Sequence, residues 1–288
     1  MNAVLERDEA QAAAVEVREL EVGGAQGPLA ARLYLSNALA NAAAGAAVKR
    51  DTLIVFFHGG GFVSGDLQEA DEFLRHLAAC NEDRAVLASN YTLATVSPFP
   101  AAVEDAHAVV LWAAKHKAKL GWTGKKLVVM GIEAGANLAA VCALMARDRA
   151  APKLAGQILI MPMLDPGLST GSMRQMNMCP DREKVTSDCA AAYRGYLPHA
   201  ADRAHPYASP LRSTRLKNLP PALILSAEDD PLCDEAEQYG AKLINAGVRT
   251  TVRRMPPAPL QDPDGRNECA CKVHALSEIA NFLALLDR

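Results

Sequence analysis

Two glycine-containing turns mark where chemistry could take place in this chain. The first is HGGGF at residues 58–62, which directly follows the apolar run TLIVFF. The second is GIEAG at residues 131–135, between an apolar run and an alanine-rich helical pattern. Successive glycines let the backbone approach a ligand closely and turn N–H groups toward a negative charge. A loop of this kind, followed about 70 residues later by a strand–turn–helix with glycines at both ends, is typical of a single anion-stabilising device.

The elements that must position these turns alternate along the chain. Apolar runs typical of strands are separated by helical patterns from Thr52 onward, which predicts a mostly parallel sheet covered by helices on both faces. Two further strands, VEVRELEV and PLAARLYL, are expected near the N-terminus. The alternation is interrupted at residues 165–218, which we interpret as a cap-like insertion over one end of the sheet. We interpret the whole sequence, residues 1–288, as one α/β domain.

Composition restricts the partners of this protein. The formal net charge is −3, with acidic and basic residues interspersed, so we expect neither nucleic acid nor a membrane surface as a partner. No apolar run is long enough to span a bilayer, and the seven cysteines are an odd number scattered over a large domain. These features favour reduced thiols and a cytoplasmic location.

Several blocks of the sequence resemble the hormone-sensitive-lipase group of α/β-hydrolases, the HGGG-type carboxylesterases. Besides HGGG and the elbow, NYTLATVSPFPAAVEDA is similar to the family's Tyr-Arg-Leu-Ala-Pro-Glu and Phe-Pro-Ala-Ala segments. The blocks YASPL, LPPALILSA and DPLCDEA are similar to three others. The resemblance implies the α/β-hydrolase fold. In a departure from the family, the helices expected before the first strands are short or missing, so we expect a reduced N-terminal cap. The resemblance also implies an oxyanion hole from the N–H groups of Gly60, Gly61 and Ala134, and Asp230 as the acid of a Ser-His-Asp triad.

Two positions depart from the family's catalytic pattern. The family's elbow reads Gly-Asp-Ser-Ala-Gly, so Glu133 stands where the nucleophilic serine should be. Counting past the last strand places Leu260 at or near the position of the histidine base, and no histidine occurs between His205 and His274. A triad needs the histidine to take the serine proton and return it to the leaving group. That cycle cannot run here.

Glu133 then has three possible roles. Its carboxylate can act as a general base, it can fold back onto the anion site that a substrate oxygen would use, or it can simply cap the following helix or face solvent. A nucleophilic role is disfavoured, because attack on an ester would give an anhydride and no histidine remains to activate water. Without a histidine partner, Asp230 is best interpreted as a cap at the start of the helix that follows it.

Cys269, Cys271 and His274 form a partial metal-ligand pattern in the region of the missing base. A tetrahedral metal needs a fourth ligand, and the spacing matches no strong motif. We therefore expect ordinary loop and helix residues there, with no metal and no cofactor.

Three functions remain open. The favoured one is a non-hydrolytic protein that binds a small ester-like or carboxylate-like molecule, or has a regulatory role, with a homodimer as a possible assembly. The alternatives are an enzyme of altered chemistry, such as a lyase, dehydratase or isomerase that uses Glu133 as its base, and a residual hydrolase of small esters.

Overall fold

The computed structural model describes residues 15–36, 50–80, 83–176, 183–257 and 265–286. The strands are β1 (Val15–Gly23), β2 (Pro28–Ser36), β3 (Arg50–Phe57), β4 (Arg84–Ser89), β5 (Trp122–Ile132), β6 (Gly156–Ile160), β7 (Ala222–Ala227) and β8 (Thr250–Met255). The α-helices are α2 (Asp71–Ala79), α3 (Ala101–Lys115), α4 (Ala134–Asp148), α5 (Gly171–Met176), α6 (Glu183–Tyr196), α7 (Cys233–Asn245), α8 (Gly265–Cys271) and α9 (Val273–Leu285). Two 3-10 helices, η2 (Ala200–Ala204) and η3 (Pro210–Arg212), complete the described elements.

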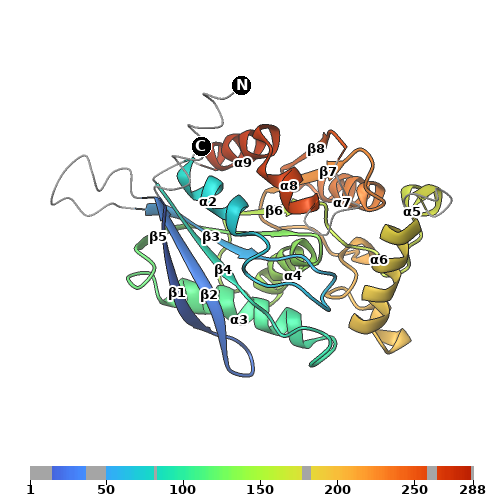
Figure 1. Ribbon diagram of the computed structural model, residues 1–288, viewed down its shortest axis with the longest axis horizontal. Coiled ribbons are helices and arrows are strands. Elements are labelled where there is room, and N and C mark those ends of the chain that lie inside the picture. The colour runs from blue at the N-terminus through green and yellow to red at the C-terminus, as the bar shows by residue number, and fades with distance from the viewer. Residues whose placement is uncertain (1–14, 37–49, 81–82, 177–182, 258–264, 287–288) are drawn as a thin grey trace.

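The strands form one sheet in the order β1-β2-β4-β3-β5-β6-β7-β8 (Figure 1). β1 pairs antiparallel with β2, and β2 pairs antiparallel with β4, whereas all later neighbours are parallel. The predicted mostly parallel sheet and the two N-terminal strands are therefore confirmed. Because β3 and β5 are neighbours in a parallel sheet, their carboxyl ends lie at the same edge, and this brings the two glycine turns together.

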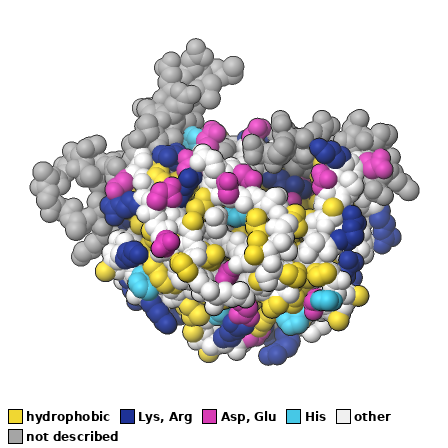
Figure 2. Space-filling model, turned by 60° about the horizontal axis from the view of Figure 1, so that its bottom comes forward, with side chains coloured by type: hydrophobic (Ala, Val, Ile, Leu, Met, Phe, Trp, Pro, Cys, Tyr) yellow, Lys and Arg dark blue, Asp and Glu magenta, His cyan; other side chains and the backbone are white. Residues whose placement is uncertain are grey.

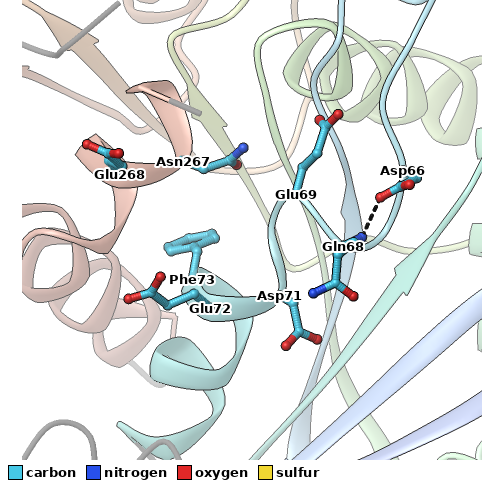
Figure 3. A pocket seen from close by; sticks show the side chains of 8 residues that line it. All are labelled: Asp66, Gln68, Glu69, Asp71, Glu72, Phe73, Asn267 and Glu268. Atoms are coloured by element: carbon cyan, nitrogen blue, oxygen red, sulfur yellow. Dashed lines mark hydrogen bonds between the residues drawn. The ribbon is translucent and has the colours of Figure 1, made fainter. Parts of the chain in front are cut away.

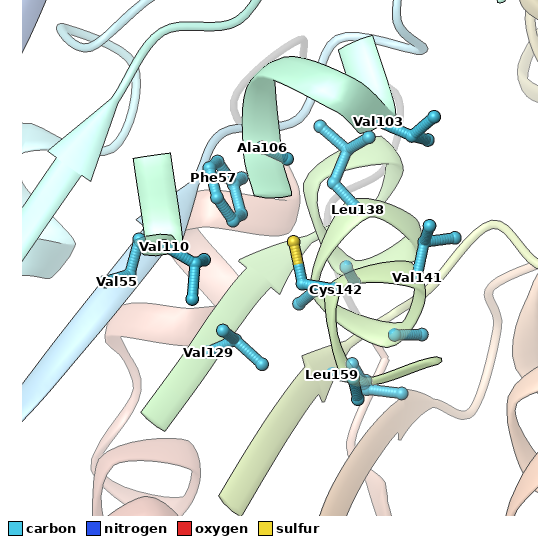
Figure 4. Close-up of a cluster of buried hydrophobic side chains, with 14 of the residues drawn as sticks. Val55, Phe57, Val103, Ala106, Val110, Val129, Leu138, Val141, Cys142 and Leu159 are labelled. Atoms are coloured by element: carbon cyan, nitrogen blue, oxygen red, sulfur yellow. The ribbon is translucent and has the colours of Figure 1, made fainter. Parts of the chain in front are cut away.

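Alternate residues of each central strand face different helical layers. Val55 and Phe57 of β3 face α3, α4 and α7, while Ile54 and Phe56 face α2, α8 and α9. Every residue of α4 from Ala134 to Ala146 is buried. This helix is therefore the centre of the layer that contains α3, α4 and α7 (Figure 4). Burial on both faces explains why the central strands are continuously apolar.

The predicted insertion contains α5, α6, η2 and η3, and α5 and α6 lie at one end of the sheet (Figure 1). Tyr196 of α6 stacks on Phe62 of the HGGGF turn, with ring centroids 3.8 Å apart. Offset or parallel stacking of this kind adds to the energy of burial. The contact fixes α6 above the first glycine turn.

The surface carries charges of both signs. On the face drawn in Figure 2, acidic and basic side chains are interspersed with hydrophobic ones. Among the described residues, no helix has both the length and the apolar character needed to cross a bilayer.

Candidate functional site

Glu133 occupies the apex of a sharp turn between β5 and α4. Its backbone has φ 55° and ψ −112°, a conformation that is rare for residues other than glycine. Its N–H donates to the Ile160 carbonyl at 2.9 Å, and its carbonyl accepts from the Met163 N–H at 3.2 Å. These two bonds hold the strained residue against the end of β6. The turn thus has the geometry of a nucleophile elbow, with a glutamate presented at its tip.

The HGGG loop is held from below by Tyr91. The Tyr91 hydroxyl lies 3.1 Å from the carbonyl oxygens of both His58 and Gly59, and its ring stacks on the His58 ring with centroids 4.4 Å apart. Gly60 and Gly61 have φ values of 93° and 60°, which glycine adopts without strain. Burial lowers the pKa of His58. The ring packs under the loop against Tyr91.

The Glu133 carboxylate binds the N–H groups of this loop. Its Oε2 accepts hydrogen bonds from Gly60 N–H at 2.7 Å and from Gly61 N–H at 3.2 Å. Of the three arrangements that the sequence left open for Glu133, the described contacts match the one in which the side chain folds back onto the loop. Ala134, the third residue that the family pattern assigns to the oxyanion hole, follows as the buried first residue of α4.

Arg266, from α8, completes the site and was not predicted from the sequence. Its Nη1 lies 3.4 Å from Glu133 Oε1, while its Nε and Nη2 lie 3.2 and 3.1 Å from the two carboxylate oxygens of Asp230. Only 16% of the Arg266 side chain is exposed, against 14% for Glu133 and 0% for Asp230. One guanidinium therefore bridges two largely buried carboxylates.

The charge state of Arg266 follows from this arrangement. Burial by itself would lower the pKa of Arg266, but the carboxylates of Asp230 and Glu133 outweigh it and raise the pKa above its ordinary value. A guanidinium has five N–H donors and no acceptor. Arg266 can thus hold carboxylates in place, but it cannot take a proton from a reacting group.

Asp230 makes more contacts than the helix cap that the sequence suggests. The N-cap residue of α7 is Leu232, and Leu232 makes no side-chain capping bond. Asp230 Oδ1 does accept the Leu232 N–H at 2.9 Å, within the turn before the helix. Both of its oxygens also bind Arg266, so the buried carboxylate has a cationic partner. Leu260, the position assigned to that histidine, lies outside the described residues.

A cavity of about 790 Å³ opens over the Glu133 carboxylate. Its wall consists of the glycine loop, the elbow, one face of α6 and the start of α8. The residues that line it include Gly60, Val63, Glu133, Val185, Cys189 and Arg266. This volume is typical of a small-molecule site.

A second cavity, of about 710 Å³, lies between α2 and α8 (Figure 3). Its lining is acidic, with Asp66, Glu69, Asp71, Glu72 and Glu268, and it shares Glu69 and Asn267 with the first cavity. Asp71 is already bound to Tyr34 and Arg75. In the part of the chain that the structure describes, no three His, Cys, Asp or Glu side chains are grouped to hold a metal ion.

The partial metal-ligand pattern falls in two different environments. Cys269 is buried against the sheet from α8, whereas His274 is exposed on α9. The side chain of Cys271 lies outside the described residues.

Comparison with known proteins agrees with this geometry. A family model described as the alpha/beta hydrolase fold matches residues 54–259, which include both glycine turns and Asp230. The chain belongs to the α/β-hydrolase fold family. Esterase LipI of Mycobacterium tuberculosis is 34% identical over 83% of this chain and 72% of its own length, and the carboxylic ester hydrolase LipN of the same organism is 37% identical over 83% and 62%. The chain thus spans about two thirds of the length of these α/β-hydrolases.

Solved α/β-hydrolase structures superpose closely on the fold. An esterase of Pyrobaculum calidifontis has a TM-score of 0.79 with 33% identity, covering 97% of this chain and 93% of its own. A thermostable esterase of Pseudomonas putida has a TM-score of 0.79 with 31% identity, covering 96% and 85%. These relatives are carboxylesterase homologues, so the chain is a carboxylesterase-like α/β-hydrolase.

Proposed function

We propose that this α/β-hydrolase does not hydrolyse esters and instead binds a small molecule in the cavity over Glu133. The observation that carries the proposal is the position of Arg266, which pairs with Asp230 where a triad has its base. Ester hydrolysis through a serine needs a nucleophile and a group that removes and returns its proton. Glu133 and Arg266 supply neither.

An enzyme that uses Glu133 as a general base is the second candidate, and the contacts of Glu133 disfavour it. Oε2 accepts two backbone hydrogen bonds, and Oε1 faces the Arg266 guanidinium. A base must bring a free lone pair to the proton that it abstracts. Oε2 already accepts two hydrogen bonds, and the lone pair that remains on Oε1 lies beside a guanidinium, so residual hydrolase and lyase-type activities are less well supported than binding.

The cavity supports a binding role. It is bounded by fixed elements, since the HGGG loop rests on Tyr91 and α6 rests on Phe62. Val63, Val185 and Ala192 contribute apolar surface to it. Its charged lining residues are Glu69, Glu133, Lys184, Asp188 and Arg266. An apolar wall with a few convergent polar groups is the usual design of a site for a small organic ligand.

Short-chain p-nitrophenyl esters test the loss of hydrolysis. We expect the purified protein to show no turnover above buffer, and Glu133→Ala to give the same result, while a homologous esterase with an intact Ser-His-Asp triad serves as the positive control. Turnover that disappears in Glu133→Ala would overturn the proposal. A thermal-shift screen with neutral esters, lactones and amides then searches for the ligand, because binding to the folded state raises its stability.

A further inference from the structure

Three donors converge on the Glu133 carboxylate. The N–H groups of Gly60 and Gly61 bind Oε2, and the Nη1 atom of Arg266 lies 3.4 Å from Oε1. An oxyanion hole built from N–H groups alone is suited to the charge that develops transiently on a substrate oxygen. A guanidinium on the second oxygen converts such a hole into a receptor for a complete carboxylate.

The receptor does not depend on Glu133 for its own structure. The Tyr91 hydroxyl holds the start of the loop through the carbonyl oxygens of His58 and Gly59, and Arg266 is held by its two contacts with Asp230. Removing the Glu133 side chain therefore leaves the donors in place and unpaired. Partly buried donors that lose their acceptor can be paired again by an incoming anion, in competition with water from the cavity.

We propose that Gly60, Gly61 and Arg266 form a carboxylate-binding site whose resident ligand is the side chain of Glu133. The wild-type cavity then rejects ligands with an inner carboxylate, because the donors are occupied and the occupant is itself an anion. The natural ligand accordingly presents an uncharged or cationic end to Glu133. This statement of ligand class rests on the proposed binding function, whereas the site itself does not.

Acetate carries the same carboxylate group as the resident ligand. Substitution of Glu133 by alanine removes Cγ, Cδ, Oε1 and Oε2, and acetate has the same number of heavy atoms. Its methyl carbon must stay in van der Waals contact with the remaining Cβ, and the cavity over residue 133 gives acetate room to meet the same donors from a shifted position. Acetamide has nearly the same shape but no negative charge to pair with Arg266.

The test is a titration of acetate into the wild-type protein, Glu133→Ala and Glu133→Gln, followed by calorimetry and by melting temperature, with chloride at equal ionic strength as the blank. We expect saturable acetate binding and a raised melting temperature only for Glu133→Ala. Glu133→Gln keeps the occupant without its charge and should not bind. For Glu133→Ala, acetamide should bind at least about tenfold more weakly than acetate.

Two results would overturn the inference. One is a folded Glu133→Ala protein that does not bind acetate, and the other is a wild-type protein that binds acetate as tightly as the variant does. Glu133→Gly provides a second test, since glycine suits the positive φ at this residue and should fold at least as well. The ester assay is unaffected by either result, so failure of the carboxylate site and failure of the non-hydrolytic function can be told apart.

Discussion

The guanidinium of Arg266 binds Asp230 through two nitrogen atoms, with Nη2 3.1 Å from Oδ1 and Nε 3.2 Å from Oδ2. This two-point geometry is the strong form of an arginine–carboxylate pair. Arg266 thus makes the contact with the acid that a triad histidine would make, but a guanidinium in a protein does not give up its proton. Asp230, at the position that the resemblance assigns to the triad acid, is thus paired with an arginine.

Restoring only the nucleophile should not restore esterase activity. In Glu133→Ser the hydroxyl faces the oxyanion N–H groups, but Arg266 cannot accept its proton. Addition of Arg266→His supplies a base beside Asp230, and a positioned base contributes about 10²- to 10⁴-fold to such reactions. We expect Glu133→Ser/Arg266→His to hydrolyse p-nitrophenyl acetate at least about tenfold faster than Glu133→Ser. Equal rates in the two variants would show that a side chain at residue 266 does not reach the nucleophile.

Removal of Arg266 should destabilise the fold strongly. Asp230 is fully buried, so Arg266→Ala leaves a carboxylate without its cation, which typically costs about 3–5 kcal/mol. The matched control is Arg254→Ala, whose partner Glu237 is 34% exposed, where a loss of at most about 1 kcal/mol is expected. Urea denaturation of the two variants measures the difference. Similar losses in both would contradict the structural role of Arg266.

Glu235 should make stability depend on pH in the opposite sense to most carboxylates. Its Oε2 accepts the N–H groups of Leu164 and Asp165, while Oε1 has no hydrogen-bond partner within the described residues. Burial raises the pKa of Glu235 well above its ordinary value. The stability from this group is complete below the pKa of the unfolded chain, about 4.3, and is lost as the pH rises toward the raised pKa of the folded state.

Substitution Glu235→Gln tests this sign. Glutamine does not titrate, so the variant should gain stability relative to the wild type as the pH rises from 5 to 8, by about 1 kcal/mol or more. Glu104→Gln is the control, because hydrogen bonding to Arg149 lowers the pKa of Glu104, and its variant should lose stability relative to the wild type as the pH rises through the range where Glu104 titrates. Urea unfolding at several pH values compares the two, and a flat difference for Glu235→Gln would contradict the assignment.

Gly135 should tolerate no side chain. A Cβ atom there would lie 2.0 Å from the Phe57 carbonyl oxygen and 2.4 Å from that of His58, so the elbow would have to separate from the first glycine turn. We expect Gly135→Ala to cost about 3 kcal/mol or more. At Gly27, where nothing lies within 4 Å of the added atom, alanine should change stability by less than about 1 kcal/mol. Thermal melts of both variants provide the comparison.

The fold was predictable because its signals are local. Apolar runs and helical patterns alternate along the chain, and the strands VEVRELEV and PLAARLYL are found as β1 and β2. The meeting of Gly60, Gly61 and Glu133 was equally predictable, since each lies in a turn that follows a central strand of a parallel sheet.

Arg266 was not predictable, because its role depends on where α8 packs. Burial of Cys269 and Ala270 against the sheet sets that position, and nothing in the residues around Arg266 indicates which carboxylates it will meet. The incomplete interpretation of Asp230 has the same origin. An aspartate before a helix suggests a cap on local grounds, and only the tertiary contact shows its partner. The one available signal was that Arg266, a cationic residue, lies six residues after Leu260, the position assigned to the histidine base.

The contacts of Glu133 and Arg266 join distant parts of the chain. Glu133 lies 73 residues after Gly60 and 133 residues before Arg266, and Arg266 lies 36 residues after Asp230. Together these contacts cross-link the end of β3, the end of β5, the turn before α7 and α8, and each contact closes a long loop. The Gly60 and Gly61 amides should then exchange their hydrogens only when larger units of the structure open. Glu133, one of the two departures from the family pattern, thus takes part in a non-covalent cross-link between these four parts of the chain.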